Sequence, residues 1–351
     1  MRPFVYTALP ARVVFGTGTL AAVADEIAGL GCSRALVLST PGQQTEAQTL
    51  AAHLGSMSAG VFAEAAMHTP VEVTERALAA LPRLKADCLV SLGGGSTIGL
   101  GKALALRTDL PQIVIPTTYA GSEATPILGE TRDGLKTTQK SPRILPEVIV
   151  YDVALTMTLP VGLSMTSGLN AIAHAAEALY AQDANPLIQL LAEDGVRAMS
   201  QALPLIKADP HDASARSQAL YGAWACGSCL GAVGMALHHK LCHTLGGGFN
   251  LPHAETHAIM LAHSLAYNEA AAPEAMARIA AALRVASAPQ GVFDLAAGLD
   301  IPTSLQQIGM PYDGLDRAAD MATRNPYWNP RLIEREAVRA LLERAWRGAR
   351  P

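Results

Sequence analysis

The first 155 residues alternate short apolar runs with longer amphipathic stretches, and this alternation limits the fold more than any other feature. The short runs are rich in β-branched and aliphatic residues, which predicts buried strands; the stretches between them have helical spacing. Strands that alternate with helices form a mostly parallel sheet covered on both faces. We expect strands at 12–15, 35–38, 88–92, 112–116 and 148–152, with helices at 20–30, before 54, at 73–84 and at 99–106.

After Pro160 the pattern changes to successive amphipathic stretches separated by proline and glycine, with few strand candidates. The sequence therefore predicts two domains, an α/β domain over residues 1–155 and an all-helical domain over residues 156–351. The helices of the second domain are expected at 164–182, 186–207, 214–245, 253–269, 273–283, 291–299 and 332–347.

Composition excludes several classes of protein. The net charge is −4 and no basic stripe occurs, so nucleic acid is not an expected partner. No charge-free apolar run reaches membrane-spanning length and the N-terminus lacks a signal peptide, which predicts a cytoplasmic protein that does not bind membranes. The five cysteines are odd in number, which fits a reducing compartment. Cys226 and Cys229 have the spacing of a redox pair, but their small-residue helical surroundings favour tight helix packing.

A glycine-rich loop follows one predicted strand. Gly93, Gly94, Gly95 and Ser96 lead from the strand 88–92 into a helix, so phosphate oxygens can approach the backbone and the N–H groups of the helix start. A tight structural turn is the alternative. Hydroxyl side chains also follow the predicted strands 35–38 and 112–116. Because the ends of parallel strands meet, these hydroxyls are expected at the same edge of the sheet as the glycine loop. The candidate cofactor-binding residues are Gly93, Gly94, Gly95, Ser96, Thr117, Thr118 and Ser39.

Six of the ten histidines fall between His238 and His263. His239 and His243 are four residues apart, as are His253 and His257, so each pair shares one face of a helix. We expect the sequence Leu-Gly-Gly-Gly at 245–248 to break the helix and to bring the two pairs together. Grouped imidazoles can bind a metal, move a proton or polarise a carbonyl, so this segment is a candidate site.

The motifs together resemble the iron-containing alcohol dehydrogenase family. They are the glycine loop, Pro-Thr-Thr-Tyr-Ala-Gly-Ser-Glu at 116–123, the segment 168–180 around Asn170 and His174, the histidine segment, and Asn-Pro-Arg at 329–331. The resemblance covers essentially the whole chain. It implies a dehydroquinate synthase-like fold, in which an α/β nucleotide-binding domain with a parallel sheet precedes an all-α domain and NADH or NADPH lies in the cleft between them. We also expect a homodimer.

Two positions depart from the family pattern. Gly99 replaces an aspartate after the glycine loop, and Asn170 replaces the aspartate of the metal site. The family's three histidine ligands correspond to His174, His239 and His253, and His243 to a histidine near the nicotinamide. Three imidazoles and one amide leave the charge of a divalent cation uncompensated, so we predict that no metal is required. The candidate catalytic residues are His243 as proton donor, with His239 and His253 binding or polarising the substrate.

The resemblance is greatest to a branch of the family that reduces maleylacetate, a dianionic enoate, to 3-oxoadipate during the breakdown of aromatic compounds. A small dicarboxylate needs cationic or hydroxyl partners, for which the candidates are Lys136, Tyr119, Thr137 and His257, followed by Thr138, Arg324 and Tyr327. Lys136 is expected on a loop. The alternatives are a metal-dependent alcohol or polyol dehydrogenase, a lyase resembling dehydroquinate synthase, and a non-catalytic nucleotide-binding protein. The residues after strand 35–38 include neither an acidic residue nor an arginine, so NADH and NADPH both stay open.

Overall fold

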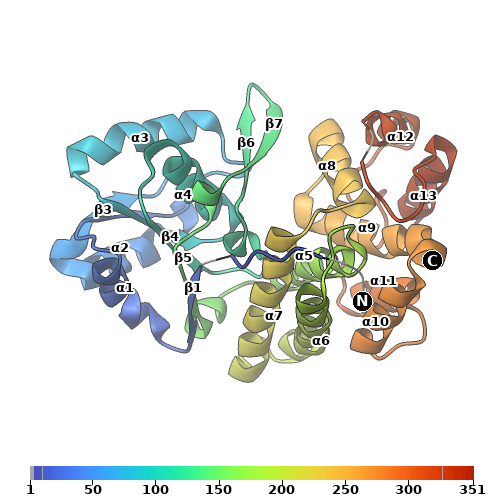
Figure 1. Cartoon of the computed structure of the whole chain (residues 1–351), viewed down its shortest axis with the longest axis horizontal. Coiled ribbons are helices and arrows are strands. Elements are labelled where there is room, and N and C mark those ends of the chain that lie inside the picture. The colour runs from blue at the N-terminus through green and yellow to red at the C-terminus, as the bar shows by residue number, and fades with distance from the viewer. Residues whose placement is uncertain (1–3, 10, 326) are drawn as a thin grey trace. The chain divides into compact units, whose positions relative to one another are not determined.

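The computed structural model describes residues 4–9, 11–325 and 327–351, and the side chains of Leu135 and Lys136 lie outside the described part. The chain forms two compact units (Figure 1). One is an α/β unit, Ala8–Leu159, and the other is a helical unit that comprises Pro160–Pro351 and residues 4–7.

The α/β unit contains a parallel sheet. Among the described residues it has six strands in the order β1-β8-β5-β4-β2-β3, and every neighbouring pair is parallel. The predicted parallel sheet is thus confirmed, but β3 was not predicted, because its sequence Ser-Ala-Gly-Val-Phe has few strong strand formers. The strands are β1 (Arg12–Gly16), β2 (Ala35–Leu38), β3 (Ser58–Phe62), β4 (Cys88–Gly93), β5 (Gln112–Pro116) and β8 (Val148–Asp152).

Helices pack on both faces of this sheet, which explains why its central strands are apolar throughout. Val37 and Val90 belong to a core cluster with residues of α1 (Val23–Gly29) and α2 (Gln44–Leu54). Leu36 and Leu89, which point to the opposite face, pack with residues of α3 (Val71–Leu84) and α4 (Gly95–Thr108).

The strand order reverses at β2. The chain passes from β2 to β3 on one side and then crosses to β4 on the other side of β2. In open α/β sheets, ligands bind at the carboxyl ends of strands where the order reverses. Ser39 follows β2 and Gly94 follows β4, so two of the candidate cofactor segments lie at this reversal.

The segment around Lys136 is a hairpin and not the predicted loop. Strands β6 (Ile127–Arg132) and β7 (Leu135–Lys140) pair in antiparallel register, with Ile127 opposite Lys140. Asp133 and Gly134 form the two-residue turn, both with positive φ (50° and 75°), and Asp-Gly is a common hairpin turn. This dipeptide was the sequence signal that the loop prediction overlooked.

Most of the predicted helices of the helical unit are confirmed. Three of the predictions for this unit are wrong or incomplete. The predicted helix 214–245 is two helices, α7 and α8, separated at residues 233–236. The glycines at 246–248 do not break α8, which continues to Phe249 and ends at Asn250 (φ 54°); a Cβ atom on Gly248 would lie 2.9 Å from Met321 Cε, so this glycine allows close packing. Helix α12 was not predicted. The helices are α5 (Val161–Tyr180), α6 (Pro186–Ala208), α7 (Ala213–Ala232), α8 (Leu237–Phe249), α9 (His253–Asn268), α10 (Pro273–Leu283), α11 (Ala288–Gly298), α12 (Leu315–Thr323) and α13 (Arg335–Arg347).

Helices α6 and α7 pack closely through small residues. A Cβ atom on Gly195 would lie 2.8 Å from Cys226 Sγ, and Cys226 and Cys229 are both buried free thiols. This agrees with helix packing as the role of the Cys-x-x-Cys segment. Among the described residues, no single helix is long and apolar enough to cross a membrane; α7 and α8 meet the limits only as a pair, bent by 96°.

Candidate active site

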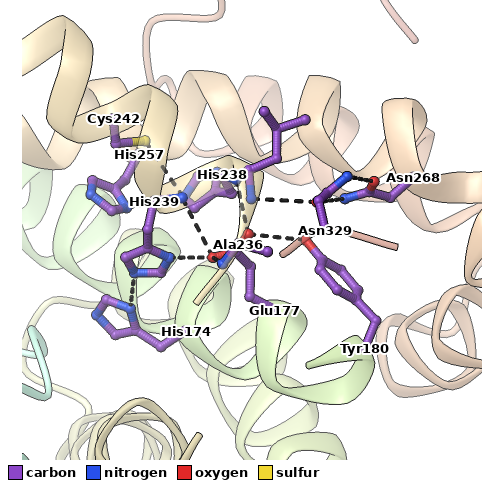
Figure 2. Close-up of polar contacts among 11 residues, drawn as sticks. His174, Glu177, Tyr180, Ala236, His238, His239, Cys242, His257, Asn268 and Asn329 are labelled. Atoms are coloured by element: carbon purple, nitrogen blue, oxygen red, sulfur yellow. Dashed lines mark hydrogen bonds and ion pairs between the residues drawn. The ribbon is translucent and has the colours of Figure 1, made fainter. Parts of the chain in front are cut away.

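Three helices of the helical unit bring the predicted histidines together (Figure 2). Helix α5 contributes Asn170, His174 and Glu177, which are spaced to share one face. Helices α8 and α9 pack against each other and add the remaining imidazoles and one thiol. The buried members of this cluster are Asn170, His174, Glu177, His238, His239, Cys242 and His257.

Glu177 is the centre of the hydrogen bonds in this cluster and was not predicted from the sequence. Its carboxylate accepts backbone N–H groups of Ala236 (3.1 Å) and His238 (2.8 Å) at the start of α8. It also accepts Nδ1–H of His239 at 2.5 Å. Burial by itself raises the pKa of Glu177, but the hydrogen bond from His239 and the other interactions with His239 and His238 lower it to about 2. The available signal was a carboxylate three residues after His174, on a helix that contains no other Asp, Glu, Lys or Arg.

The ionised carboxylate fixes the protonation of two histidines. Since Glu177 can only accept, His239 carries its proton on Nδ1 and leaves Nε2 as an acceptor. His174 Nδ1 lies 2.9 Å from that nitrogen and donates to it. The two rings stack with centroids 5.0 Å apart. Glu177, His239 and His174 thus form a chain of hydrogen bonds with one direction.

His238 and His257 form a second buried pair. His238 Nε2 lies 3.0 Å from His257 Nδ1. Burial, followed by the neighbouring His239, lowers the pKa of His238 to about 3, and burial together with His253 lowers that of His257 well below its ordinary value. Both rings are therefore neutral at neutral pH. His257, a candidate substrate-binding residue, is only 1% exposed.

His243 and His253 are the solvent-exposed histidines of this group. The ring of His243 lies 6.2 Å from that of His239, and the ring of His253 lies 4.4 Å from that of His257. Helices α8 and α9 thus each present one exposed imidazole beside the buried network. This position allows proton exchange with solvent, as a proton donor requires.

The positions of the family's metal ligands do not form a metal site here. Among the described residues, the donor atoms of His174, His239 and His253 are not within 4.8 Å of one another as a set. The neutral Asn170 stands at the aspartate position. The one buried carboxylate, Glu177, contacts the opposite nitrogen of His239. These residues do not fit a divalent cation.

The α/β unit brings the predicted cofactor segments together. A Cβ atom on Gly94 would lie 2.9 Å from Thr118 Cγ2, and Thr117 donates its N–H to the carbonyl of Gly93 (3.2 Å). Gln43, which was not predicted, donates to Thr117 Oγ1 (3.1 Å). Ser39 Oγ is buried without a hydrogen-bond partner among the described residues.

Helix α4 begins at Gly95, four residues earlier than predicted, with Ser96 in its first turn and no side chain capping its N-terminus. A bare backbone and an uncapped helix start are suited to phosphate groups, so these segments fit a dinucleotide. Gly99, which replaces the family's aspartate, packs against Thr69: a Cβ atom there would lie 2.2 Å from Thr69 Oγ1. No larger side chain fits at position 99 unless Thr69 moves.

Lys102 ties α4 to the loop that contains the second cofactor segment. Its buried ammonium donates to the carbonyls of Ser122 (2.5 Å), Thr125 (2.8 Å) and Ile127 (3.0 Å) and to Thr125 Oγ1 (3.0 Å). The glycine loop at the start of α4 is thereby connected to the residues that follow β5.

The predicted substrate-binding residues of the α/β unit differ in their surroundings. Tyr119 is fully buried. Thr137 and Thr138 are exposed on β7, and the side chain of Lys136, also on β7, lies outside the described part. In the helical unit, Arg324 is exposed after α12, and the ring of Tyr327 lies 5.6 Å from Lys240 Nζ. These assignments stay predictions.

Comparison with known proteins identifies the family. The model of the iron-containing alcohol dehydrogenases matches residues 10–153, and that of the C-terminal domain of the same family matches residues 164–346. The chain therefore belongs to the iron-containing alcohol dehydrogenase family, as its motifs predicted.

Its relatives include maleylacetate reductases. The chain is 62% identical to the maleylacetate reductase of Rhizobium sp. (strain MTP-10005) and 57% identical to that of Burkholderia cepacia, each over 100% of both chains. The crystal structure of maleylacetate reductase from Agrobacterium tumefaciens superposes with a TM-score of 0.98 at 62% identity and full coverage of both chains.

Proposed function

We propose that this chain is an oxidoreductase that reduces maleylacetate to 3-oxoadipate with NADH or NADPH. The observation that carries the proposal is its end-to-end similarity, at 62% identity, to a maleylacetate reductase. The histidine cluster supports it, because grouped imidazoles suit polarisation of a carbonyl without a metal.

The α/β unit would hold the cofactor. Gly93, Gly94, Gly95 and Ser96 would receive phosphate oxygens, with Thr117, Thr118 and Ser39 beside them. The absence of an acidic side chain after β2 permits either dinucleotide. The bound nicotinamide supplies a hydride to the carbon–carbon double bond of the substrate.

The histidines would manage the charge that develops on the substrate. As the double bond gains a hydride at the carbon farther from the ketone, electron density moves to the ketone oxygen and forms an enolate. An N–H donor from His253 would stabilise this oxygen. His239 gives its Nδ1–H to Glu177 and would act by orienting His174. His243, exposed beside His239, would deliver the proton to the adjacent carbon and regain it from solvent, which completes the addition of two hydrogens.

The two substrate carboxylates would be bound by Lys136, Thr137, Tyr119 and His257. If Lys136 holds one of them, Lys136→Ala should raise KM for the dianion and leave cofactor affinity unchanged. The loss of one charge-assisted hydrogen bond costs on the order of 1.5–3 kcal/mol, or roughly ten- to a hundredfold in kcat/KM. An unchanged kcat/KM would remove Lys136 from the site.

The decisive experiment is NADH and NADPH oxidation with maleylacetate, with and without chelator, compared with alcohol oxidation. We expect rapid reduction of maleylacetate that survives chelation and far slower turnover of ethanol, propanediol or glycerol. The second candidate is a metal-dependent alcohol or polyol dehydrogenase, on grounds of family alone. Alcohol turnover that equals or exceeds maleylacetate reduction and is lost on chelation would establish it instead.

A further inference from the structure

A second set of donor atoms lies beside the candidate active site. His238 and Cys242 are one turn apart on α8, and His257 faces them from α9 (Figure 2). His238 Nε2 lies 3.0 Å from His257 Nδ1 and 3.7 Å from Cys242 Sγ, and the three donors are all within 4.8 Å of one another. Each side chain is at most 1% exposed.

The separations of His238 from His257 and Cys242 are close to those between the ligands of a zinc ion. Zn²⁺ binds imidazole nitrogen at about 2.0–2.1 Å and thiolate sulfur at about 2.3 Å, so ligand atoms in a tetrahedral site lie roughly 3.3–3.6 Å apart. Shifts of a few tenths of an ångström would bring His238 into these separations from His257 and Cys242, and the third pair is already within 4.8 Å. We propose that His238, Cys242 and His257 form a site for a thiophilic divalent cation, with Zn²⁺ as the ion to test.

Charge favours this site over the family's ligand positions. The family positions offer imidazoles and the neutral Asn170, whereas Cys242 supplies a thiolate. The ionised Glu177 lies beside both sets, through the ring of His239 and the backbone N–H of His238, so the thiolate is the difference between them. Sulfur ligands also favour Zn²⁺ over the hard cations Mg²⁺ and Ca²⁺.

Binding exchanges one proton for the metal ion. The thiol of Cys242 loses its proton to solvent as the S–Zn bond forms. The proton shared by His238 and His257 moves to one of the outer ring nitrogens, so both inner nitrogens bind the ion. No electron is transferred.

An ion at this site would affect the neighbouring histidines. The ring of His257 lies 5.1 Å from that of His239 and 4.4 Å from that of His253. Metal binding would replace the hydrogen bond between His238 and His257, and we expect added Zn²⁺ to inhibit turnover. Inhibition rests on the proposed function, whereas binding does not.

The test is titration of the chelator-treated, reduced full chain with Co²⁺, followed by displacement with Zn²⁺. We expect one equivalent to give a thiolate-to-cobalt charge-transfer band that Zn²⁺ abolishes. Cys242→Ser should remove the band and weaken Zn²⁺ affinity at least tenfold. Cys229→Ser changes a buried thiol in a different helix, α7. This variant should leave the cobalt band and the Zn²⁺ affinity unchanged.

His257→Asn provides a second variant and should weaken Zn²⁺ binding while the Cys242 thiol is present. Circular dichroism confirms that each variant is folded before the titration. The absence of a thiolate band in the wild-type chain, or a band that persists in Cys242→Ser, would overturn the proposal. Binding of Zn²⁺ by a chain whose Co²⁺ form shows no thiolate-to-cobalt band would assign the ion to exposed histidines. That result would also overturn the proposal. Because binding is read without turnover, the result stands whatever substrate the enzyme uses.

Discussion

Lys102 in the α/β unit and Glu177 in the helical unit are both buried charged side chains with several hydrogen bonds, yet their environments act on their charges in opposite ways. Burial lowers the pKa of Lys102 to about 7, although Glu123 opposes the shift. The pKa of Glu177 falls to about 2, which favours its charged form in spite of burial. The burial of a charge does not by itself determine whether the charge persists.

The difference lies in the partners. Lys102 faces carbonyl and hydroxyl oxygens, which are neutral dipoles collected from one loop. Glu177 faces the N-terminus of α8, where backbone N–H groups converge, and an imidazole that donates at 2.5 Å. Lys102 therefore organises a loop, whereas Glu177 maintains a negative charge that orients histidines.

Removal of the charge at position 177 tests this contrast most strongly. Glu177→Gln keeps the shape but lets the amide donate to His239 Nδ1, which reverses the tautomers of His239 and His174. We expect kcat/KM to fall about a hundredfold, or roughly 2.7 kcal/mol, mainly through kcat. Steady-state kinetics with Glu193→Gln, a partly exposed glutamate of α6, as control would measure this. A loss confined to KM would contradict an orienting role.

Removal of the charge at position 102 should weaken cofactor binding, because Lys102 holds the loop that follows β5. Lys102→Met leaves the carbonyls of Ser122, Thr125 and Ile127 without their donor, at a cost of about 1–3 kcal/mol for each group that finds no water. We expect a lower midpoint of urea unfolding and a roughly tenfold higher KM for NADH, with a smaller change in kcat. Lys85→Met, at an exposed position of the same unit, is the matched control. An unchanged KM for NADH would show that the loop keeps its conformation without Lys102.

The comparison also predicts how stability depends on pH. The lowered pKa values of Glu177, about 2, and His238, about 3, mean that the folded state binds fewer protons than the unfolded chain. The free energy of unfolding should therefore fall with acidification, below the ordinary pKa of 6.5 for His238 and of 4.5 for Glu177, by at most roughly 1.4 kcal/mol per pH unit for each group.

Urea unfolding across this range would measure the slope. His238→Asn should flatten the slope between pH 6.5 and 4.5, whereas His211→Asn, at an exposed histidine, should not. A slope that is equal in the wild type and His238→Asn would show that other groups control acid unfolding.

The sequence predicted the α/β unit well because its signals are local. Apolar runs such as 35–38 and 112–116 identify buried strands, and glycine at 93–95 indicates a backbone that must be approached closely. The hairpin was missed although Asp133-Gly134 marks its turn, because the flanking residues alternate weakly. In the helical unit, the local sequence at 245–248 predicts a break in α8, but Gly248 instead packs against Met321, a contact distant in sequence.

The candidate site was predicted in composition but not in connectivity. Helical spacing identified the pairs His239–His243 and His253–His257 and placed Asn170 with His174. It could not show that Glu177 accepts from the start of α8, because that contact joins residues about sixty positions apart. Nor could it separate the buried His257 from the exposed His253, since exposure depends on how α8 and α9 pack.

The smallest expected effect concerns metal. Because Asn170, His174, His239 and His253 do not form a site for a divalent cation, we predict that exhaustive chelation leaves maleylacetate reduction unchanged. Asn170→Asp restores one negative charge beside three imidazoles and should create metal binding at these positions, which persists when Cys242 is also changed to serine. Without metal, the new carboxylate should repel the dianionic substrate and raise the pKa of nearby histidines, so kcat/KM should fall by less than about tenfold. Metal analysis and kinetics on the same preparations measure both effects. Wild-type protein that carries a full equivalent of metal at these positions and loses activity on chelation would show that an amide can replace the carboxylate ligand.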